Sequence, residues 1–216
     1  MAEHLAITIG RQFGSGGKDI GIRLGELLGI KVYDKELLTL AAEKKGFHVD
    51  YLRHVDEKAT SSLLYTLVMG ASAHGARHLG VDMSINDQLF IAQTEIIREL
   101  AEEGPAIFIG RCADYVLRNH PNRLSFFIYS DFETRVQRVM QRQELSRAQA
   151  EAKINKTDKK RINYYNFYTG NKWGKYENYH MSLDSSLLGV EGTAQMMVRL
   201  IEIYKAEGFE KKGLNT

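Results

Sequence analysis

The amino-acid sequence predicts an α/β protein in which helices cover both faces of a mostly parallel β-sheet. Three short apolar runs, at residues 5–10, 107–110 and 124–129, have the continuous hydrophobic character of strands that are buried on both faces. Each run is followed by a segment with helical periodicity, and such alternation is typical of parallel sheets. A glycine-rich turn joins the first strand to its helix. We therefore expect ligands to bind at the carboxyl ends of these strands.

The remaining elements continue this alternation. The first predicted helix ends at Gly29, a suitable C-terminal stop, and a short second strand precedes Asp34. A second long helix ends near Gly104, a weak strand spans residues 179–183, and a last helix spans residues 190–204. The apolar positions that support the first two helices are Ile20, Leu24, Leu27 and Leu28, and then Phe90, Ile91, Ile97 and Leu100.

The length and composition predict a single domain over residues 1–216. A chain of 216 residues with 44% hydrophobic residues can bury one substantial core. Residues 46–88 carry scattered His, Ser, Gly and Met with weak periodicity, which predicts a helical insertion on the substrate side. That composition suits either a cover over the site or a homodimer contact. Residues 133–178 are rich in Arg, Lys, Gln, Asn and Tyr, and we expect a lid region there.

Several classes of protein are disfavoured by composition. The net charge of +2 is too small for the concentrated basic face of a nucleic-acid binder. The single cysteine, Cys112, excludes an intrachain disulfide, and we expect it to be a small packing residue. The sequence offers no run of about 18 apolar residues that could span a bilayer, and its start lacks a basic signal region. We expect a cytoplasmic protein with small-molecule partners, and neither a nucleic-acid nor a membrane partner.

The glycine-rich turn in ITIGRQFGSGGKDIG is the first candidate site. A helix that follows such a turn presents its N-terminal amides and its dipole to a phosphate, and glycines let the backbone approach the anion closely. The strand–turn–helix context matches a P-loop, although the pattern GxxxxGK[ST] is not satisfied. Anchoring it on Lys18 loses the first glycine and the hydroxyl residue, and anchoring it on Gly14 and Gly16 puts Gly17 at the lysine position. The alternative is a turn that only packs the helix on the sheet.

Polar residues after two other strands form the second candidate site. Arg111 directly follows the strand at 107–110, and its guanidinium can hold two oxygens of a phosphate. The alternative is an arginine that pairs with a carboxylate across a loop. Asp34 follows the second strand, where it either orients a substrate or a metal-bound water, or caps the helix that begins at Lys35. We expect Arg123 to be a surface charge.

The segment DKKRINYYNFYTGNKWG, residues 158–174, is the third candidate. Cations that flank an aromatic cluster and a glycine-bounded loop suit a lid, which supplies arginines to a transferring phosphoryl group and excludes water. Arg161 is the candidate for the γ-phosphate charge. The alternative is a solvated helix face for the lysines and ordinary packing for the aromatic residues. Just before this segment, three arginines at i, i+3 and i+7 share one predicted helix face; they are Arg135, Arg138 and Arg142.

Together these motifs resemble the cytidylate kinase-like family of bacterial P-loop proteins, over roughly residues 5–204. The resemblance implies a nucleoside monophosphate kinase-like fold with a five-stranded parallel sheet, a P-loop, a nucleotide-binding region and a lid. It implies that Arg111 contacts the acceptor phosphate, and that Asp114 compensates for the aspartate replaced by Cys112. Asp158 is implied to face the nucleoside, and Arg161 to contact the phosphates. The implied ATP-binding residues are Arg11, Gly14, Ser15, Gly16, Gly17, Lys18 and Asp19.

The function implied by the resemblance is ATP-dependent phosphoryl transfer to a CMP-like nucleoside monophosphate or a related small acceptor. ATP and Mg²⁺ would be required, with Asp19 as an indirect Mg²⁺ ligand and with Lys18, Arg111 and Arg161 as the catalytic residues. Positioning and charge neutralisation would carry the rate. Because the loop departs from the P-loop pattern, the alternatives are a nucleotide-binding protein with little kinase activity and an anion-binding or interaction module.

Overall fold

The structure is a computed structural model that describes residues 4–34, 39 and 85–206. Contacts divide the chain into two units, one formed by residues 1–34 with 97–216 and the other by residues 35–96. The first unit contains the sheet and the candidate site. Most of the predicted insertion at residues 46–88 lies outside the described residues, so its structure and role remain predictions, as does the single domain.

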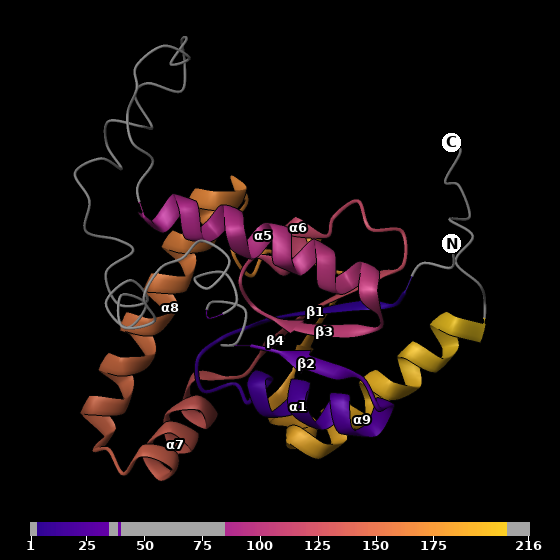
Figure 1. The fold of residues 1–216 in the computed structure, drawn as a ribbon. Coiled ribbons are helices and arrows are strands. Elements are labelled where there is room, and N and C mark those ends of the chain that lie inside the picture. Colours follow the sequence, from indigo (N-terminus) through magenta and orange to yellow (C-terminus); the bar gives the residue numbers. More distant parts are fainter. Residues whose placement is uncertain (1–3, 35–38, 40–84, 207–216) are drawn as a thin grey trace, which may run out of the picture. The chain divides into compact units, whose positions relative to one another are not determined.

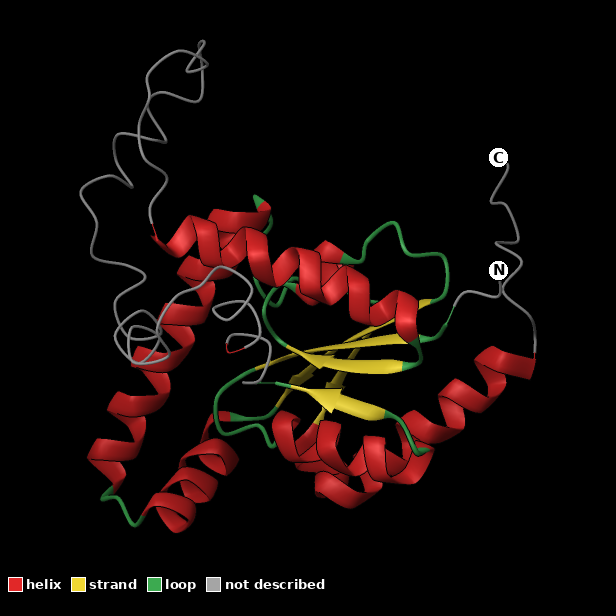
Figure 2. Cartoon of the chain, viewed as in Figure 1, coloured by secondary structure: helices red, strands yellow, loops and turns green. Residues whose placement is uncertain are grey.

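Five parallel strands form one sheet in the order β2-β3-β1-β4-β5. Figure 2 draws the strands of this sheet in yellow. The central strand β1 pairs with β3 on one side and with β4 on the other. This architecture confirms the predicted five-stranded parallel sheet, and each apolar run seen in the sequence corresponds to a strand. The strands are β1 (Ala6–Arg11), β2 (Lys31–Tyr33), β3 (Ala106–Ile109), β4 (Arg123–Tyr129) and β5 (Met181–Asp184).

Helices α1 and α9 cover one face of the sheet, and the short helix α6 lies on the other (Figure 1). Helices α7 and α8 form an antiparallel pair beside the carboxyl end of β1. Helix α9 is broken at Gly189, whose backbone is not helical. The helices are α1 (Gly17–Leu28), α5 (Ile85–Glu103), which spans the boundary between the units, α6 (Ala113–Val116), α7 (Phe132–Gln143), α8 (Arg147–Thr169) and α9 (Ser185–Ala206), with a 3₁₀ turn at Tyr176–Asn178.

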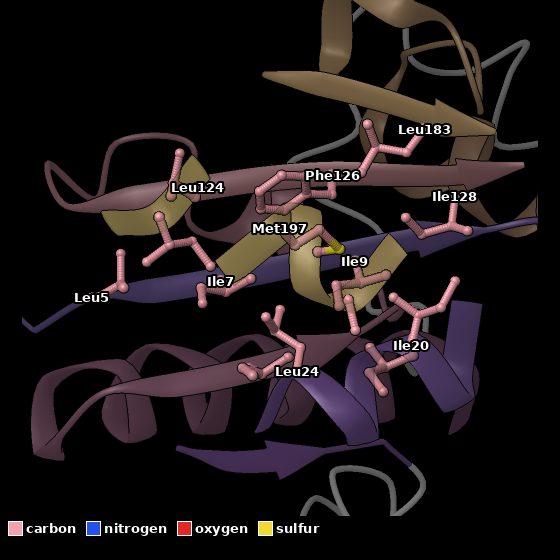
Figure 3. Close-up of a cluster of buried hydrophobic side chains, with 14 residues drawn as sticks. Leu5, Ile7, Ile9, Ile20, Leu24, Leu124, Phe126, Ile128, Leu183 and Met197 are labelled. Carbon is pink, nitrogen blue, oxygen red and sulfur yellow. The ribbon is translucent and has the colours of Figure 1, made fainter. Parts of the chain in front are cut away.

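The core between the sheet and helices α1 and α9 fixes the position of the site (Figure 3). Successive side chains of a strand point to opposite faces, so Ile7 and Ile9 of β1 point toward these two helices. Ile20 and Leu24 of α1 and Met197 of α9 pack against them and are fully buried. Because α1 is anchored over the middle of the sheet, its N-terminus stays at the carboxyl end of β1.

Candidate active site

The loop at residues 12–16 connects β1 to α1 in a conformation suited to an anion. Gly14 and Gly16 have positive φ angles of 79° and 77°, and Gly16 is the N-cap residue of α1. Because the N-cap residue Gly16 has no capping side chain, the amides of Lys18 and Asp19, which lack partners within the helix, are available to a ligand, whereas Gly17 N is already bound by Ser15. Ser15 is fully buried, and its hydroxyl donates to Gln12 O at 2.9 Å and accepts from Gly17 N at 3.3 Å.

Two cations and one carboxylate meet beside this loop. Lys18 Nζ lies 2.8 Å from Asp34 Oδ2, and Arg11 Nη2 lies 3.5 Å from Asp34 Oδ1. These residues come from the first turn of α1, the end of β1 and the residue after β2. The structure thus brings Asp34, predicted as a substrate-side residue, together with Arg11 and Lys18, predicted for ATP, at the strand ends where open α/β sheets bind ligands.

Arginines from α7 and α8 hold the loop by donating hydrogen bonds to backbone carbonyl groups. Arg161 donates to Arg11 O at 2.9 Å, Arg135 donates to Phe13 O at 3.3 Å, and Arg138 donates to Ser15 O at 3.0 Å. The carbonyl oxygens of three alternate residues, Arg11 at the end of β1 and Phe13 and Ser15 in the loop, are therefore each bound by one guanidinium. This bracing fixes the path of the loop before any ligand arrives, which is the arrangement that electrostatic preorganisation requires.

Two further groups complete the bracing. Asp158 accepts from Phe13 N at 2.8 Å and pairs with Arg135 at 2.5 Å, so its carboxylate is bound to the loop and to α7. Ser185, at the start of α9, donates its hydroxyl to Ser15 O at 2.5 Å. The arginine spacing predicted that Arg135 and Arg138 share a helix face, but it indicated no role for them, and no sequence pattern pointed to Ser185. The i, i+3 spacing of arginines on a short helix was the available signal.

Asp19, predicted as an indirect Mg²⁺ ligand, forms a bidentate ion pair with Arg142. The two distances are 2.6 and 2.8 Å, and the hydrogen bonds from the guanidinium to Asp19 raise the pKa of Arg142. Arg142, the third arginine of the predicted face on α7, therefore contacts the first turn of α1, just after the loop. Within residues 4–34, 39 and 85–206, no group of three or more His, Cys, Asp or Glu side chains is arranged to hold a metal ion.

The turn after β3 has an unusual backbone. Gly110, Arg111 and Cys112 have consecutive positive φ angles of 75°, 56° and 55°. For residues other than glycine this region costs roughly 1–2 kcal/mol each, and such strain is concentrated at functional sites. The turn sets Arg111 at the carboxyl end of β3. Cys112 is buried, and burial raises the pKa of its thiol, which agrees with the predicted packing role.

Asp114 lies in a buried polar cluster rather than on an open surface. Its carboxylate accepts from the Tyr165 hydroxyl at 2.6 Å, and Arg123 donates to its backbone oxygen at 2.6 Å. Burial raises the pKa of Asp114 and lowers the pKa of Arg123. Arg123, expected to be a surface charge, is partly buried, and its guanidinium binds the Asp114 backbone.

The buried carboxyl group of Asp114 gives a pH-dependent prediction. Because the pKa of Asp114 is raised, the folded protein binds the carboxyl proton more tightly than the unfolded chain does. Ionisation of Asp114 therefore lowers the free energy of unfolding as pH rises above about 3.9, the pKa in the unfolded chain. Asp114→Asn keeps an acceptor for Tyr165 and removes the ionisable group. We expect the melting temperature of the variant, relative to the parent, to increase as pH is raised from about 4 to about 8.

Thermal unfolding followed by circular dichroism at several pH values measures this difference. Asp131→Asn is the control with the opposite sign, since hydrogen bonds from Thr134 lower the pKa of the exposed Asp131. Its relative melting temperature should instead fall as pH is raised from about 2 to about 5 and stay level above that, because a lowered pKa stabilises the ionised form around and below the ordinary value of about 3.9. A difference for Asp114→Asn that does not change with pH would contradict the assignment of a raised pKa.

The predicted lid region, residues 133–178, contains α7 from its second residue, α8 and the 3₁₀ turn, and it ends just before β5. Residues 158–169, expected as part of a lid, form the C-terminal half of α8, whose C-cap residue is Gly170. Asp158 and Arg161 are therefore one helical turn apart, and both reach the loop. Trp173 packs edge-on against Phe127 of β4, with ring centroids 5.2 Å apart. Movement of the region as a lid remains a prediction.

Comparison with solved structures places the fold among P-loop kinases. An uncharacterized protein from Eubacterium ventriosum ATCC 27560 is 28% identical, with 93% of this chain and 100% of that chain covered and a TM-score of 0.68. Shikimate kinase from Bacteroides thetaiotaomicron is 14% identical, with coverages of 92% and 98% and a TM-score of 0.53. Shikimate kinase from Acinetobacter baumannii, in complex with shikimate, is 17% identical, with coverages of 93% and 94% and a TM-score of 0.51. At these low identities the two kinases confirm the predicted P-loop, nucleoside monophosphate kinase-like fold alone.

The curated proteins compared with this chain include none that matches it. No helix in the described ranges has the length and apolar character needed to cross a bilayer. The model of the cytidylate kinase-like family matches residues 6–187, from β1 through the braced loop, the Gly110–Cys112 turn and α8 to the first turn of α9. The chain therefore belongs to the cytidylate kinase-like family.

Proposed function

We propose that the protein is a cytoplasmic kinase that transfers the γ-phosphoryl group of ATP to a CMP-like nucleoside monophosphate or a related small acceptor. The observation that carries this proposal is the bracing of alternate loop carbonyls by Arg135, Arg138 and Arg161. A loop held in this way, next to Lys18 and Arg11, presents fixed positive charge to a polyphosphate. Membership of a kinase-like family supports the same reaction class.

The residues at the loop fit the chemistry of Mg²⁺ and ATP. The first-turn amides of α1, Lys18 and Arg11 would hold phosphate oxygens. Mg²⁺ usually keeps several waters and binds through one or two carboxylates together with substrate phosphates, so a single carboxylate would suffice, either that of Asp34 or, after release from Arg142, that of Asp19. When bound, Mg²⁺ neutralises charge that develops on the phosphates. Asp34 now pairs with both cations, and a bound phosphate would compete with its carboxylate for them.

On the acceptor side, Arg111 would bind the phosphate of the nucleoside monophosphate. Asp34 is the carboxylate best placed to contact the acceptor, since it lies at the strand ends beside Lys18. Asp114 and Asp158 would act as positioning residues, because their carboxylates are bound to Tyr165 and to the loop. Little covalent work is asked of the protein, and the rate would come from alignment and charge neutralisation.

The test is a coupled ADP-release assay with Mg²⁺ and ATP against CMP, dCMP, UMP, AMP and GMP. We expect ADP release that depends on one of these acceptors, with CMP or dCMP giving the highest kcat/KM. Reactions without acceptor measure background hydrolysis. Equal ADP release with and without every acceptor would contradict nucleoside monophosphate kinase activity.

A second function, nucleotide binding with little kinase activity, is favoured by one observation. The lysine position of the P-loop is occupied by Gly17, so the usual cation is missing from the helix start. This alternative predicts that ATP raises the melting temperature without product formation. At about 100 times its dissociation constant, a ligand adds about 2.7 kcal/mol to the free energy of unfolding. Thermal shift and ADP release on the same sample separate the two functions.

A further inference from the structure

We infer that Arg11 supplies the phosphate-binding cation that lysine supplies in an ordinary P-loop, and that it does so from the opposite end of the loop. The phosphate contact rests on the proposed function. In the P-loop pattern the lysine directly follows the second glycine. When Gly16 is aligned with that second glycine, Arg11 occupies the position of the first glycine and Gly17 occupies the position of the lysine. The glycine and the cation have exchanged places.

The geometry explains why the two changes occur together. A Cβ atom added to Gly17 would lie 2.5 Å from Arg11 Cβ and 3.2 Å from Arg11 Cγ, and the first distance is shorter than Cβ contacts in proteins allow. Only one of these two positions can therefore carry a side chain. A lysine at position 17 requires a glycine at position 11, and Arg11 requires Gly17.

The outer part of the Arg11 side chain needs a second glycine. A Cβ atom added to Gly110, after β3, would lie 1.8 Å from Arg11 Nη1. The guanidinium thus passes over the end of β3 and lies 3.5 Å from Asp34, which also pairs with Lys18. The side chain is only 19% exposed, so it is fixed in this path. Its charge is held where the carboxyl ends of β1, β2 and β3 meet, which is the expected position of a bound phosphate.

The first experiment tests the shared space without any ligand. We expect Gly17→Ala to lower the melting temperature of the parent by about 4–8 °C, as overpacking does in a domain of this size. In an Arg11→Gly background, Gly17→Ala should lower the melting temperature by no more than half of the decrease seen in the parent. Gly21→Ala is the matched control, because its added Cβ would meet Ile109 and Ile9 instead of Arg11. Its effect should be equal in both backgrounds. An equal effect of Gly17→Ala in both backgrounds would contradict the inference that the side chains at positions 11 and 17 compete for the same space.

The second experiment measures binding of MgATP and of pyrophosphate by calorimetry. Arg11→Gly should weaken both dissociation constants about 10- to 100-fold, the loss expected for a hydrogen bond from a charged group. The swapped variant Arg11→Gly/Gly17→Lys should recover at least half of the lost binding free energy. Arg199→Ala, which removes an exposed arginine paired with Glu202, is the control and should bind as the parent does.

The outcomes separate this inference from the proposed function. If the parent binds MgATP and Arg11→Gly binds it equally well, the inference fails while the proposed function stands. A swapped variant that binds no better than Arg11→Gly also overturns the inference. If the parent binds neither MgATP nor pyrophosphate, the proposed function and the phosphate contact fail together.

Discussion

Replacement of Lys18 by alanine is expected to lower kcat for acceptor-dependent ADP release by about 100- to 1000-fold, the loss seen when one preorganised donor is removed from a site of charge development. Lys18 lies in the first turn of α1, and its ammonium reaches Asp34 at the ends of the strands. Loss of this cation would leave Arg11 as the remaining partner of Asp34 at the strand ends, with less positive charge to offset that of the transferring phosphate. Stability should change little, because the side chain is 48% exposed and exposed ion pairs contribute about 1 kcal/mol or less.

Steady-state kinetics together with a melting curve checks this expectation. Lys205→Ala, at the exposed end of α9, is the matched control and should retain the activity of the parent. Retained turnover in Lys18→Ala, with an unchanged melting temperature, would remove Lys18 from the catalytic residues. A decrease in kcat accompanied by a large loss of stability would instead make Lys18 a structural residue. Arg111→Ala, tested in the same way, should raise KM for the acceptor.

The second large effect is expected for Asp158→Ala. The side chains of Asp158 and Arg135 are 14% and 10% exposed, so removing the carboxylate leaves a nearly buried guanidinium without its counter-charge. It also removes the acceptor for Phe13 N. Removing one partner of a buried ion pair costs about 3–5 kcal/mol, which corresponds to a decrease in melting temperature of about 6–20 °C for a domain of this size.

Urea unfolding monitored by circular dichroism measures the free energy directly. Glu151→Ala, which breaks an exposed ion pair with Arg147 on the same helix, is the control and should cost less than about 0.5 kcal/mol. Asp158→Asn should lie between the two, because it keeps an acceptor but loses the charge. Equal stabilities of Asp158→Ala and Glu151→Ala would show that the contact between α8 and the loop contributes nothing measurable.

The sequence was sufficient to predict the strands and the glycine turn because both depend on local patterns. Short apolar runs are buried on both faces of a parallel sheet, and β1, β3 and β4 follow those runs. Gly29 ends α1 in the left-handed conformation that its position predicted. These features need no knowledge of what packs against them.

The bracing of the loop could not be predicted in the same way. It joins residues that are more than 100 positions apart, such as Ser15 with Arg138 and with Ser185, and no local pattern encodes such a pairing. Helix α8 was missed for a related reason: its charged and aromatic residues do not gather into one apolar stripe. Its start is fixed instead by a capping box between Ser146 and Gln149. The role expected for Asp158 toward the nucleoside gave no hint that its carboxylate binds the loop backbone.

The bracing of alternate loop carbonyls also has a consequence for synthesis on the ribosome. The loop at residues 12–16 emerges early, but the groups that hold it belong to residues 135–185 and emerge much later. A nascent chain therefore exposes the glycine turn for most of its translation without the contacts that shape it. We expect the nascent chain to become competent for nucleotide binding only after Ser185 has left the exit tunnel, so a stalled or truncated product that ends before α9 should not retain ATP.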